Sequence, residues 1–323
     1  AVIWLNFNYF YRVEHKIEKI LKEKVKAFEK CNFLIAVSGG VDSMVLANLF
    51  LKNNLSFSVA HCNFKLRSKE SDIDQDFVKK WSFKHKIHCH SNEFNTVEFC
   101  KKNKMGIQEG ARKLRYDWFD ELLSKYDFDY LVTAHHLDDQ IETYLINSSR
   151  GSGIKGLLGI VSSTKKIFRP LLDVLKIDIL NYAKLNSVEY REDSSNSSDD
   201  YQRNMIRNSI LPRFKEFDDN VMLKFKTTIN NLHSTKIFVD SIIEDTKNEL
   251  FKIDSKSIKV NIEMLMQKKP LEFYVHNLFY EFGFNYKEVI KIFNSDSGKL
   301  ILSTTHSMTK LDRKSTRLNS RHQ

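Results

Sequence analysis

Short apolar runs alternate with longer amphipathic segments from residue 33 to residue 215. The run FLIAV at 33–37 is continuously apolar, which is typical of a strand buried on both faces of a sheet. The segment Asp42–Lys52 that follows has the spacing of a helix with one apolar side. That side consists of Val45, Leu46, Leu49 and Phe50. The pattern therefore predicts a strand followed directly by a helix.

The alternation continues along the chain. Further strands are predicted at 55–61, 86–90 and 130–136, and further helices at 71–85, 107–126 and 137–147. Strands that alternate with helices of this length indicate an α/β fold, in which a parallel sheet is covered by helices on both faces. Ligands of such sheets bind outside the carboxyl ends of the strands. The chemically richest segments follow predicted strands at this edge: 38–43, 61–67 and 135–142.

The sequence changes character near Asp218. One or two amphipathic helices are expected after it, and the stretches SIKVNI and GKLILS indicate a small mixed second domain. The final segment, KLDRKSTRLNSRHQ at 310–323, carries five Lys or Arg residues against one Asp and has no apolar periodicity. We interpret it as a disordered tail or a cloning or sequencing scar. The expected organisation is an N-terminal extension at 1–32, an α/β domain at 33–217, a helical linker with the second domain at 218–309, and the tail at 310–323.

Composition narrows the class of protein. The chain has 323 residues, enough for two domains, and a formal net charge of +10. Such a charge favours a polyanionic partner (RNA, DNA or a nucleotide), although a basic housekeeping enzyme fits it equally well. The four cysteines form neither a CxxC pair nor a zinc-finger spacing, which indicates a reducing, cytosolic compartment. The apolar opening at 1–11 is too short to cross a bilayer, so no membrane segment is expected.

The hexapeptide SGGVDS at 38–43 joins the first predicted strand to the first helix. Adjacent glycines let the backbone wrap closely around an anion, and a helix N-terminus supplies unpaired N–H groups with partial positive charge. Ser38 and Ser43 add hydroxyl donors. Asp42 would repel a bare phosphate, so it indicates a magnesium ion between its carboxylate and the phosphates. We interpret the loop as a pyrophosphate site, although a glycine-rich turn with Ser and Asp caps gives the same pattern.

Three carboxylates follow the fourth predicted strand. Asp138 and Glu142 are four residues apart, and Asp139 and Glu142 are three apart, so they share one face of the predicted helix. Acids are also common at helix starts, because they complement the helix dipole. The histidines His135 and His136, at the strand's carboxyl end, favour a functional site over that simpler explanation.

Arginines recur in two later segments. Arg112 and Arg115 belong to the helix predicted at 107–126, and Arg203 and Arg207 lie four apart on one face of a further helix. Arginine suits bidentate contacts to phosphate, and surface salt bridges are the alternative.

Two motifs are expected to be misleading. The stretch GSGIKG at 151–156 fits GxGxxG, but a predicted helix rather than a strand precedes it, so we expect a flexible loop that could touch RNA through Arg150 and Lys155. The stretch HKIHCH at 85–90 could supply metal ligands, but a strand with alternating sides is favoured.

Together with further segments, SGGVDS resembles the PP-loop of the ATP pyrophosphatase superfamily, and the chain resembles one branch of it, the tRNA(Ile)-lysidine synthetases. The matching segments are AHCNFKLR at 60–67, EGARKLRY at 109–116, HHLDDQIET at 135–143, RGSGIKGLLGI at 150–160, RPLL at 169–172 and EDSSNSSDDYQRNMIRNSILP at 192–212. The resemblance covers Phe33–Arg213. It implies a PP-loop nucleotide-binding domain, adenine nucleotide alpha hydrolase-like, at 33–217 and a substrate- or tRNA-binding role for 218–309.

The resemblance implies ATP-dependent attachment of free lysine to the wobble cytidine of an isoleucine tRNA with a CAU anticodon. The base's 2-carbonyl oxygen attacks the α-phosphate, pyrophosphate leaves, and the lysine ε-amine then displaces AMP. This amine has an ordinary pKa near ~10.4, so carboxylates are expected to attract and deprotonate it. The implied catalytic residues are Asp138, Asp139, Glu142 and Arg112. The implied ATP-binding residues are Ser38, Gly39, Gly40, Val41, Asp42, Ser43, His61 and Arg203, with Asp42 also holding Mg²⁺.

Two other functions remain open from the sequence. One is another PP-loop tRNA-modifying enzyme, such as a 2-thiolase, although the thiocytidine branch uses paired CxxC cysteines that are absent here. The other is a catalytically inactive tRNA-binding protein, for which acids beside the phosphate loop would serve no purpose. A homodimer formed through the helical segment after Asp218 is a further hypothesis.

Overall fold

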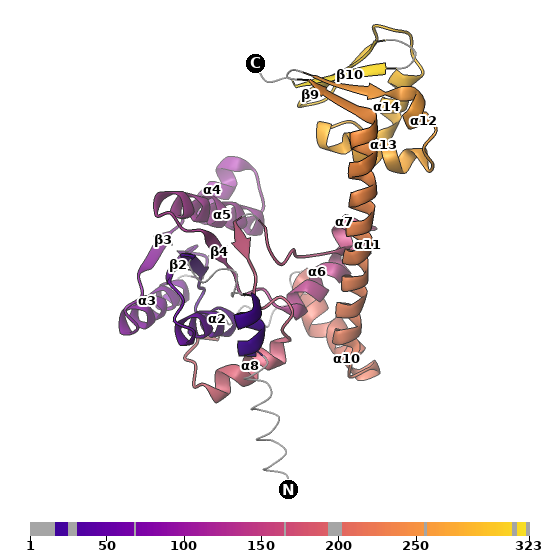
Figure 1. Cartoon of the computed structure of the whole chain (residues 1–323). Coiled ribbons are helices and arrows are strands. Elements are labelled where there is room, and N and C mark those ends of the chain that lie inside the picture. Colours follow the sequence, from indigo (N-terminus) through magenta and orange to yellow (C-terminus); the bar gives the residue numbers. More distant parts are fainter. Residues whose placement is uncertain are drawn as a thin grey trace. The chain divides into compact units, whose positions relative to one another are not determined.

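The computed structural model describes residues 17–24, 31–67, 69–164, 166–192, 202–254, 257–311 and 315–320. The chain divides into two compact units, Ala1–Asn230 and Asn231–Gln323 (Figure 1). The boundary falls inside one long helix, α11 (Val221–Leu250). Each unit has its own hydrophobic core.

The first unit is built on a parallel sheet. Its strands lie in the order β3 (Cys89–Glu93), β2 (Phe57–Asn63), β1 (Phe33–Ala36), β4 (Tyr130–Val132) and β5 (Ile167–Phe168). Each neighbouring pair is parallel. The predicted α/β class is therefore confirmed. The two-residue strand β5 was not predicted, because so short a run carries no periodicity.

Helices cover both faces of this sheet (Figure 1). Helices α2 (Val41–Lys52), α3 (Lys69–Lys84) and α8 (Lys176–Leu185) pack on one face, and α4 (Thr96–Asn103) and α5 (Ile107–Lys125) lie on the other. Alternate residues of β1 feed the two cores: Phe33 and Ile35 join the first, and Leu34 joins the second. Both faces of β1 are therefore buried, which explains its continuously apolar sequence.

Two predicted strands are displaced along the chain. The second begins at Phe57 rather than residue 55 and extends to Asn63, and the third occupies 89–93 rather than 86–90. Asn54 and Lys86 have φ values of 52° and 57°, which are left-handed turn conformations. The extended conformation of each strand therefore begins only after these turns. The residues of β3 are mostly polar, which hid this strand from a search for apolar runs.

A second group of helices completes the first unit. It consists of α6 (Leu137–Ser149), α7 (Ile154–Leu157), α9 (Gln202–Met205), the π-helical turn η3 (Ile206–Ile210), α10 (Leu211–Phe217) and the start of α11. Leu137 and Ile141 of α6 pack with Ile206, Leu211 and Val221 in a small separate core. This core holds the η3 turn against α6, which carries the acidic cluster.

Part of the predicted N-terminal extension belongs to the main core. Residues 17–24 are helical, and the side chains of Ile17 and Leu21 are fully buried. Lys24 Nζ lies 2.6 Å from Asp173 Oδ2. The rest of the region before Cys31 lies outside the described residues.

The second unit is a small α and β domain, as the sequence predicted. Its antiparallel sheet has the strand order β6 (Phe251–Asp254), β7 (Ser257–Asn261), β10 (Ser315–Ser320), β9 (His306–Lys310) and β8 (Leu300–Leu302). Its helices are α12 (Ile262–Met266), α13 (Leu271–Phe279) with the 3₁₀ turn η4 (Tyr280–Phe282), and α14 (Tyr286–Phe293). Val260, Leu278, Phe279 and Met308 are among its buried core residues.

The final segment differs from the expected disordered tail. Residues 315–320 form β10, which pairs with both β7 and β9. Thr316 and Leu318, two residues apart, are buried on one side of this strand. The prediction of disorder is therefore wrong for these residues, because two flanking strands supply hydrogen bonds that sequence periodicity does not register. Pairing does not test the other interpretation, a cloning or sequencing scar, which stays a prediction. Residues 312–314 and 321–323 lie outside the described residues.

Helix α11 covers 30 residues and was predicted as one or two amphipathic helices. Neither it nor any other helix in the described ranges is long and apolar enough to cross a membrane.

Candidate nucleotide and carboxylate site

The glycine-rich loop closes on itself through its two serines. Ser43 Oγ donates to the carbonyl oxygen of Gly40 at 2.9 Å and accepts from the Ser38 N–H at 3.2 Å. The Gly40 N–H donates to Ser38 Oγ at 3.3 Å. Gly40 is the N-cap of α2 without a side-chain cap, so the N–H groups of the first turn remain available to an anion. The loop thus has the geometry of a phosphate site.

A chain of hydrogen bonds from other parts of the sequence fixes the start of this loop. Gly39 has φ +95°, a conformation that a side chain would strain. Its carbonyl oxygen accepts a 3.0 Å hydrogen bond from the Arg191 N–H. The Arg191 guanidinium donates to Asp74 of α3 at 2.7 Å, and Arg67 contacts the same carboxylate at 3.2 Å. Segments far apart in the sequence therefore fix the position of Gly39.

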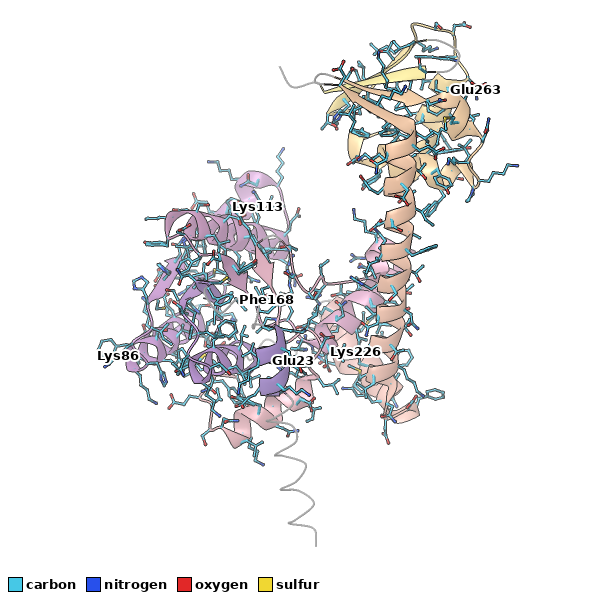
Figure 2. All side chains as sticks on the ribbon, viewed as in Figure 1. Glu23, Lys86, Lys113, Phe168, Lys226 and Glu263 are labelled. Atoms are coloured by element: carbon cyan, nitrogen blue, oxygen red, sulfur yellow. The ribbon has the colours of Figure 1, made fainter. Side chains whose placement is uncertain are left out.

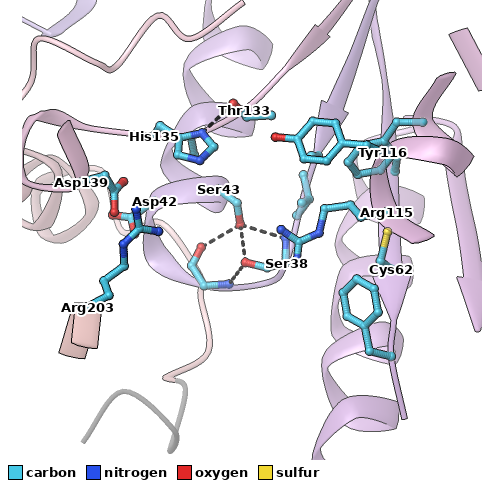
Figure 3. Close-up of a pocket in the computed structure, with 17 residues that line it drawn as sticks. Ser38, Asp42, Ser43, Cys62, Arg115, Tyr116, Thr133, His135, Asp139 and Arg203 are labelled. Atoms are coloured by element: carbon cyan, nitrogen blue, oxygen red, sulfur yellow. Dashed lines mark hydrogen bonds between the residues drawn. The ribbon is translucent and has the colours of Figure 1, made fainter. Parts of the chain in front are cut away.

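One pocket connects this loop with the acidic cluster. Its volume is about 300 Å³, and we call it the nucleotide pocket. Ser38 and Ser43 lie at its floor, with Asp42, Asp139 and Arg203 on one side and Cys62, Arg115 and Tyr116 on the other (Figure 3). The wall also includes the apolar side chains Ala60, Phe64 and Phe119. A pocket with a charged end and an apolar end suits a nucleotide, which has phosphates and a base.

The three predicted carboxylates do not share one environment. Asp139 lines the nucleotide pocket, whereas Asp138 and Glu142 are not among its lining residues. Asp138 Oδ2 accepts from the Lys176 N–H at 2.8 Å, so this carboxylate caps the first turn of α8. The structure thereby separates a carboxylate that faces the pocket from one that stabilises a helix.

Glu142 is held by an arginine from a distant segment. Its side chain is fully buried, and Arg207 makes two hydrogen bonds to it, at 2.7 and 3.0 Å. Burial raises the pKa of Glu142, while Arg207 opposes that change. The Arg207 guanidinium also lies 3.2 Å from Asp139 Oδ1. One cation therefore offsets the repulsion between two carboxylates on the same helix face.

Asp139 stays ionised despite its burial. Burial acts to raise its pKa, but the side chain and N–H of His136, together with His135 and Arg207, lower it below the ordinary value. Asp139 Oδ2 accepts from the His136 N–H at 3.1 Å, which forms half of a capping box at the start of α6. The pocket therefore presents a fixed negative charge beside the phosphate loop.

Asp42 already holds a cation. Lys176 Nζ lies 2.5 Å from its Oδ1, and Asp42 lines the nucleotide pocket at the start of α2. Lys176 is 134 residues away and was not predicted as a site residue. No local spacing signals such a contact.

The arginines separate into different positions. Arg203 lines the nucleotide pocket, donates to Thr143 Oγ1 at 2.9 Å and lies 3.5 Å from Glu142. Arg115 also lines it, with its guanidinium 5.1 Å from the ring centre of Phe64. Arg112 is exposed and lines a neighbouring pocket instead. Of the predicted pair on α5, Arg115 is thus the one that faces the nucleotide pocket.

The histidine predicted to contact ATP lies behind the loop. His61 is buried in β2, and its Nδ1 lies 2.8 Å from the carbonyl oxygen of Val37. A carbonyl only accepts, so Nδ1 carries the proton. Burial lowers the pKa of His61, which keeps the ring neutral. His61 is not among the residues that line the nucleotide pocket, and it instead supports the strand end from which the loop begins.

Several wall residues were missed by the sequence analysis. Ala60, Cys62 and Phe64 are two residues apart and face the pocket from β2 and its end. Alternate residues of a strand point to the same side, so the three residues could have been predicted together once one of them was known to face the site.

The GSGIKG stretch, which was expected to be a flexible loop, contains the short helix α7, and Asn147 Nδ2 donates to the Gly156 carbonyl oxygen at 2.8 Å. No group of three or more potential metal ligands occurs in the part of the chain that the structure describes.

The environment of His135 predicts how the stability of the fold depends on pH. It lines the nucleotide pocket, its Nδ1 lies 2.8 Å from Thr133 Oγ1, and burial lowers its pKa to about 4. Asp139 opposes this change, and Arg169, Arg203 and Arg112 add to it. Between the folded value and the unfolded value near ~6.5, only the unfolded chain binds the proton, so stability falls as pH decreases through this window.

Replacing His135 with glutamine is therefore expected to flatten the fall in unfolding free energy between pH 7 and pH 5, by on the order of 1 kcal/mol. Denaturant titrations at both pH values measure it. His233→Gln, at an exposed position of α11, is the matched control. Equal pH dependence in wild type and His135→Gln would contradict the prediction.

The fold and this site define a nucleotide-binding α/β protein with its phosphate loop after the first strand. Residues 11–214 match the PP-loop domain family, and residues 253–320 match the TilS substrate binding domain. The chain therefore belongs to the PP-loop family, in its tRNA(Ile)-lysidine synthase branch.

Named relatives agree with this placement. The tRNA(Ile)-lysidine synthase of Bacteroides thetaiotaomicron is 30% identical over 287 residues, which are 89% of this chain and 66% of that protein. The protein of the same name from Petrotoga mobilis is 40% identical over 210 residues, 64% of this chain and 67% of that protein. The chain thus spans just under two thirds of the Bacteroides protein's length.

A solved structure supports the fold. The U34-tRNA thiolase NcsA from Methanococcus maripaludis, determined with its [4Fe-4S] cluster, superposes with a TM-score of 0.57 at 16% identity. The match covers 69% of this chain and 80% of that chain. At this identity the likeness shows a common fold, which agrees with the predicted PP-loop domain.

Proposed function

We propose that this protein uses ATP to attach free lysine to the wobble cytidine of an isoleucine tRNA with a CAU anticodon. The observation that carries the proposal is the meeting of the phosphate loop and Asp139 in one pocket. The names of the relatives and the match to a substrate binding domain give the substrate class. A reducing, cytosolic compartment fits this role, and the homodimer stays a prediction.

ATP is proposed to lie with its phosphates on the loop. The N–H groups at the start of α2 and the Ser38 hydroxyl hold the β- and γ-phosphates. The Ser43 hydroxyl joins them when it turns from the Gly40 carbonyl oxygen to the phosphates. His61 acts indirectly, through the Val37 carbonyl oxygen. Arg203 and Arg115 lie on opposite walls of the nucleotide pocket. Both are proposed to contact the phosphates of ATP, including the α-phosphate that the base attacks.

The residues present fit a magnesium ion. Mg²⁺ is usually held by one or two carboxylates, substrate phosphates and water, and Asp42 supplies a carboxylate beside the loop. Its Oδ1 already pairs with the Lys176 ammonium, so a magnesium ion at that oxygen would displace this contact. When bound, Mg²⁺ would offset the charge that develops on the departing pyrophosphate.

The reaction is proposed to proceed in two displacements. The 2-carbonyl oxygen of cytidine bonds to the α-phosphorus as the bond to pyrophosphate breaks. The lysine ε-nitrogen then bonds to C2 of the base as the C2–O bond to AMP breaks. The ammonium must first lose a proton, and Asp139, ionised and facing the pocket, is placed to attract it and receive that proton. Glu142 and Arg207 hold Asp139 in position.

The test is an assay with ATP, radiolabelled lysine and an isoleucine tRNA transcript that has a CAU anticodon. We expect one lysine incorporated per tRNA, with AMP and pyrophosphate released in equal amounts. A transcript with the wobble cytidine replaced by uridine is the control and is expected to take up no label. Sulfur incorporation without lysine would support a thiolase, and tRNA binding without AMP release would support an inactive binder.

A further inference from the structure

A second pocket lies beside the nucleotide pocket. Its volume is about 460 Å³, within the range of roughly 300–1,000 Å³ that small-ligand pockets occupy. We call it the arginine pocket. It is lined by Met105, Glu109, Arg112, Lys113, Tyr116, Ile167 and Arg169. Tyr116 lines both pockets, so the two share a wall.

Two structural elements build the arginine pocket. Positions 109, 112, 113 and 116 of α5 repeat at helical spacing and face it together. Strand β5 closes the opposite side, with Ile167 in the strand and Arg169 directly after it. Figure 2 labels Lys113 on α5 and Phe168 on β5 within the same unit. The pocket therefore opens at the carboxyl edge of the sheet, like the nucleotide pocket.

Its arginines are not neutralised by the protein. Arg169 is only 7% exposed, yet its hydrogen bond from Nη1 goes to the Val161 carbonyl oxygen, and its buried Nε has no partner in the described part of the chain. Arg112 makes no ion pair within the described residues, and its guanidinium lies 4.9 Å from the ring centre of Tyr116. Within the described ranges, Arg169 is a buried charge without a counter-charge, which is costly, and the exposed Arg112 adds a second unpaired cation at the same pocket. Together they indicate an anionic ligand.

The ligand must also suit an aromatic wall. Arg112 stacked over Tyr116 offers a flat cationic surface, and such surfaces bind unpaired RNA bases beside their phosphates. The shared Tyr116 wall places such a nucleotide next to the nucleotide pocket. Lys113 already pairs with Asp117 at 2.8 Å, so Arg112 and Arg169 are the principal contacts.

We infer that the arginine pocket binds the backbone phosphate of a single-stranded RNA nucleotide at or next to the reacting cytidine. The inference rests on the proposed function for the identity of the RNA. Arg112 and Arg169 contact the phosphodiester, and Tyr116 separates this nucleotide from ATP. Arg112 thereby acts on the RNA substrate rather than on the triphosphate.

The test measures RNA binding apart from catalysis. An isoleucine tRNA transcript is titrated into wild type, Arg112→Gln and Arg169→Lys without lysine, at several salt concentrations. Each variant is expected to weaken binding about tenfold, and Arg112→Gln to lower the salt slope by about 0.7 to 0.9 through one lost phosphate contact. Affinity for a fluorescent ATP analogue is expected to change less than twofold.

The matched control is Arg213→Gln, which removes the same charge from an exposed arginine paired with Glu216. Equal losses of RNA affinity in Arg112→Gln and Arg213→Gln would overturn the inference, because the loss would then come from the lower net charge of the protein and not from the arginine pocket. A loss of ATP affinity with unchanged RNA affinity would assign the pocket to the nucleotide instead. Circular dichroism checks the fold of Arg169→Lys, and Arg112, being exposed, tests the pocket independently.

The two proposals fail in different ways. A wild-type protein that transfers no lysine, while the arginine variants still weaken RNA binding selectively, would reject only the proposed reaction. If the wild-type protein transfers lysine and Arg112→Gln leaves its RNA affinity unchanged, only the proposed role of the arginine pocket would be rejected.

Discussion

Asp139→Asn is expected to reduce lysine transfer by about 10²- to 10⁴-fold, the range of effect of a general base. The asparagine oxygen can still accept the His136 N–H, so the start of α6 is retained. ATP affinity is expected to stay within about threefold of wild type, since the phosphate loop is unchanged. Single-turnover transfer of labelled lysine and titration with a fluorescent ATP analogue measure the two effects separately.

Two comparison variants make this result specific. Asp120→Asn alters an exposed aspartate of α5 and is expected to behave as wild type. Asp138→Ala removes the neighbouring carboxylate, which caps α8, and is expected to lower thermal stability more than it lowers transfer. Wild-type turnover in Asp139→Asn would remove the argument for a carboxylate base.

Arg207→Met is expected to destabilise the first unit by about 3 kcal/mol, because it leaves the fully buried Glu142 without its bidentate partner. Arg203, 3.5 Å from Glu142, offsets part of the loss. Removing Arg207 raises the pKa of Glu142 further, since Arg207 lowers it in the folded chain. The deficit is therefore expected to shrink as pH falls, when Glu142 becomes protonated.

A double-mutant cycle tests this expectation in denaturant titrations at pH 8 and pH 5.5. Arg207→Met combined with Glu142→Gln is expected to recover much of the lost stability, because neither residue then leaves a buried charge. Arg213→Met breaks an exposed pair with Glu216 and is expected to cost less than about 1 kcal/mol. A cost for Arg207→Met no larger than this would show that the buried pair is not an important contribution to stability.

Local patterns predicted the elements whose sequences are long or continuously apolar. Helix α5 was expected at 107–126 and is observed at Ile107–Lys125, and α2 follows the phosphate loop as expected. Strand β3 was misplaced because its residues CHSNE are polar, and β10 was taken for a tail because only its partners β7 and β9 make it a strand. These errors arise where hydrogen bonding to distant segments, not local preference, decides the structure.

The candidate site shows the same division. The sequence by itself placed SGGVDS after a strand and three carboxylates on one helix, because the spacing of neighbouring residues fixes the side to which each points. Only the tertiary structure decided that Asp139 faces the pocket, that Asp138 caps α8 through Lys176, and that Arg207 holds Glu142. These contacts join residues 38 and 65 positions apart. Helix spacing relates residues only over a few turns, so the packing of whole elements selects among groups that the sequence leaves equivalent.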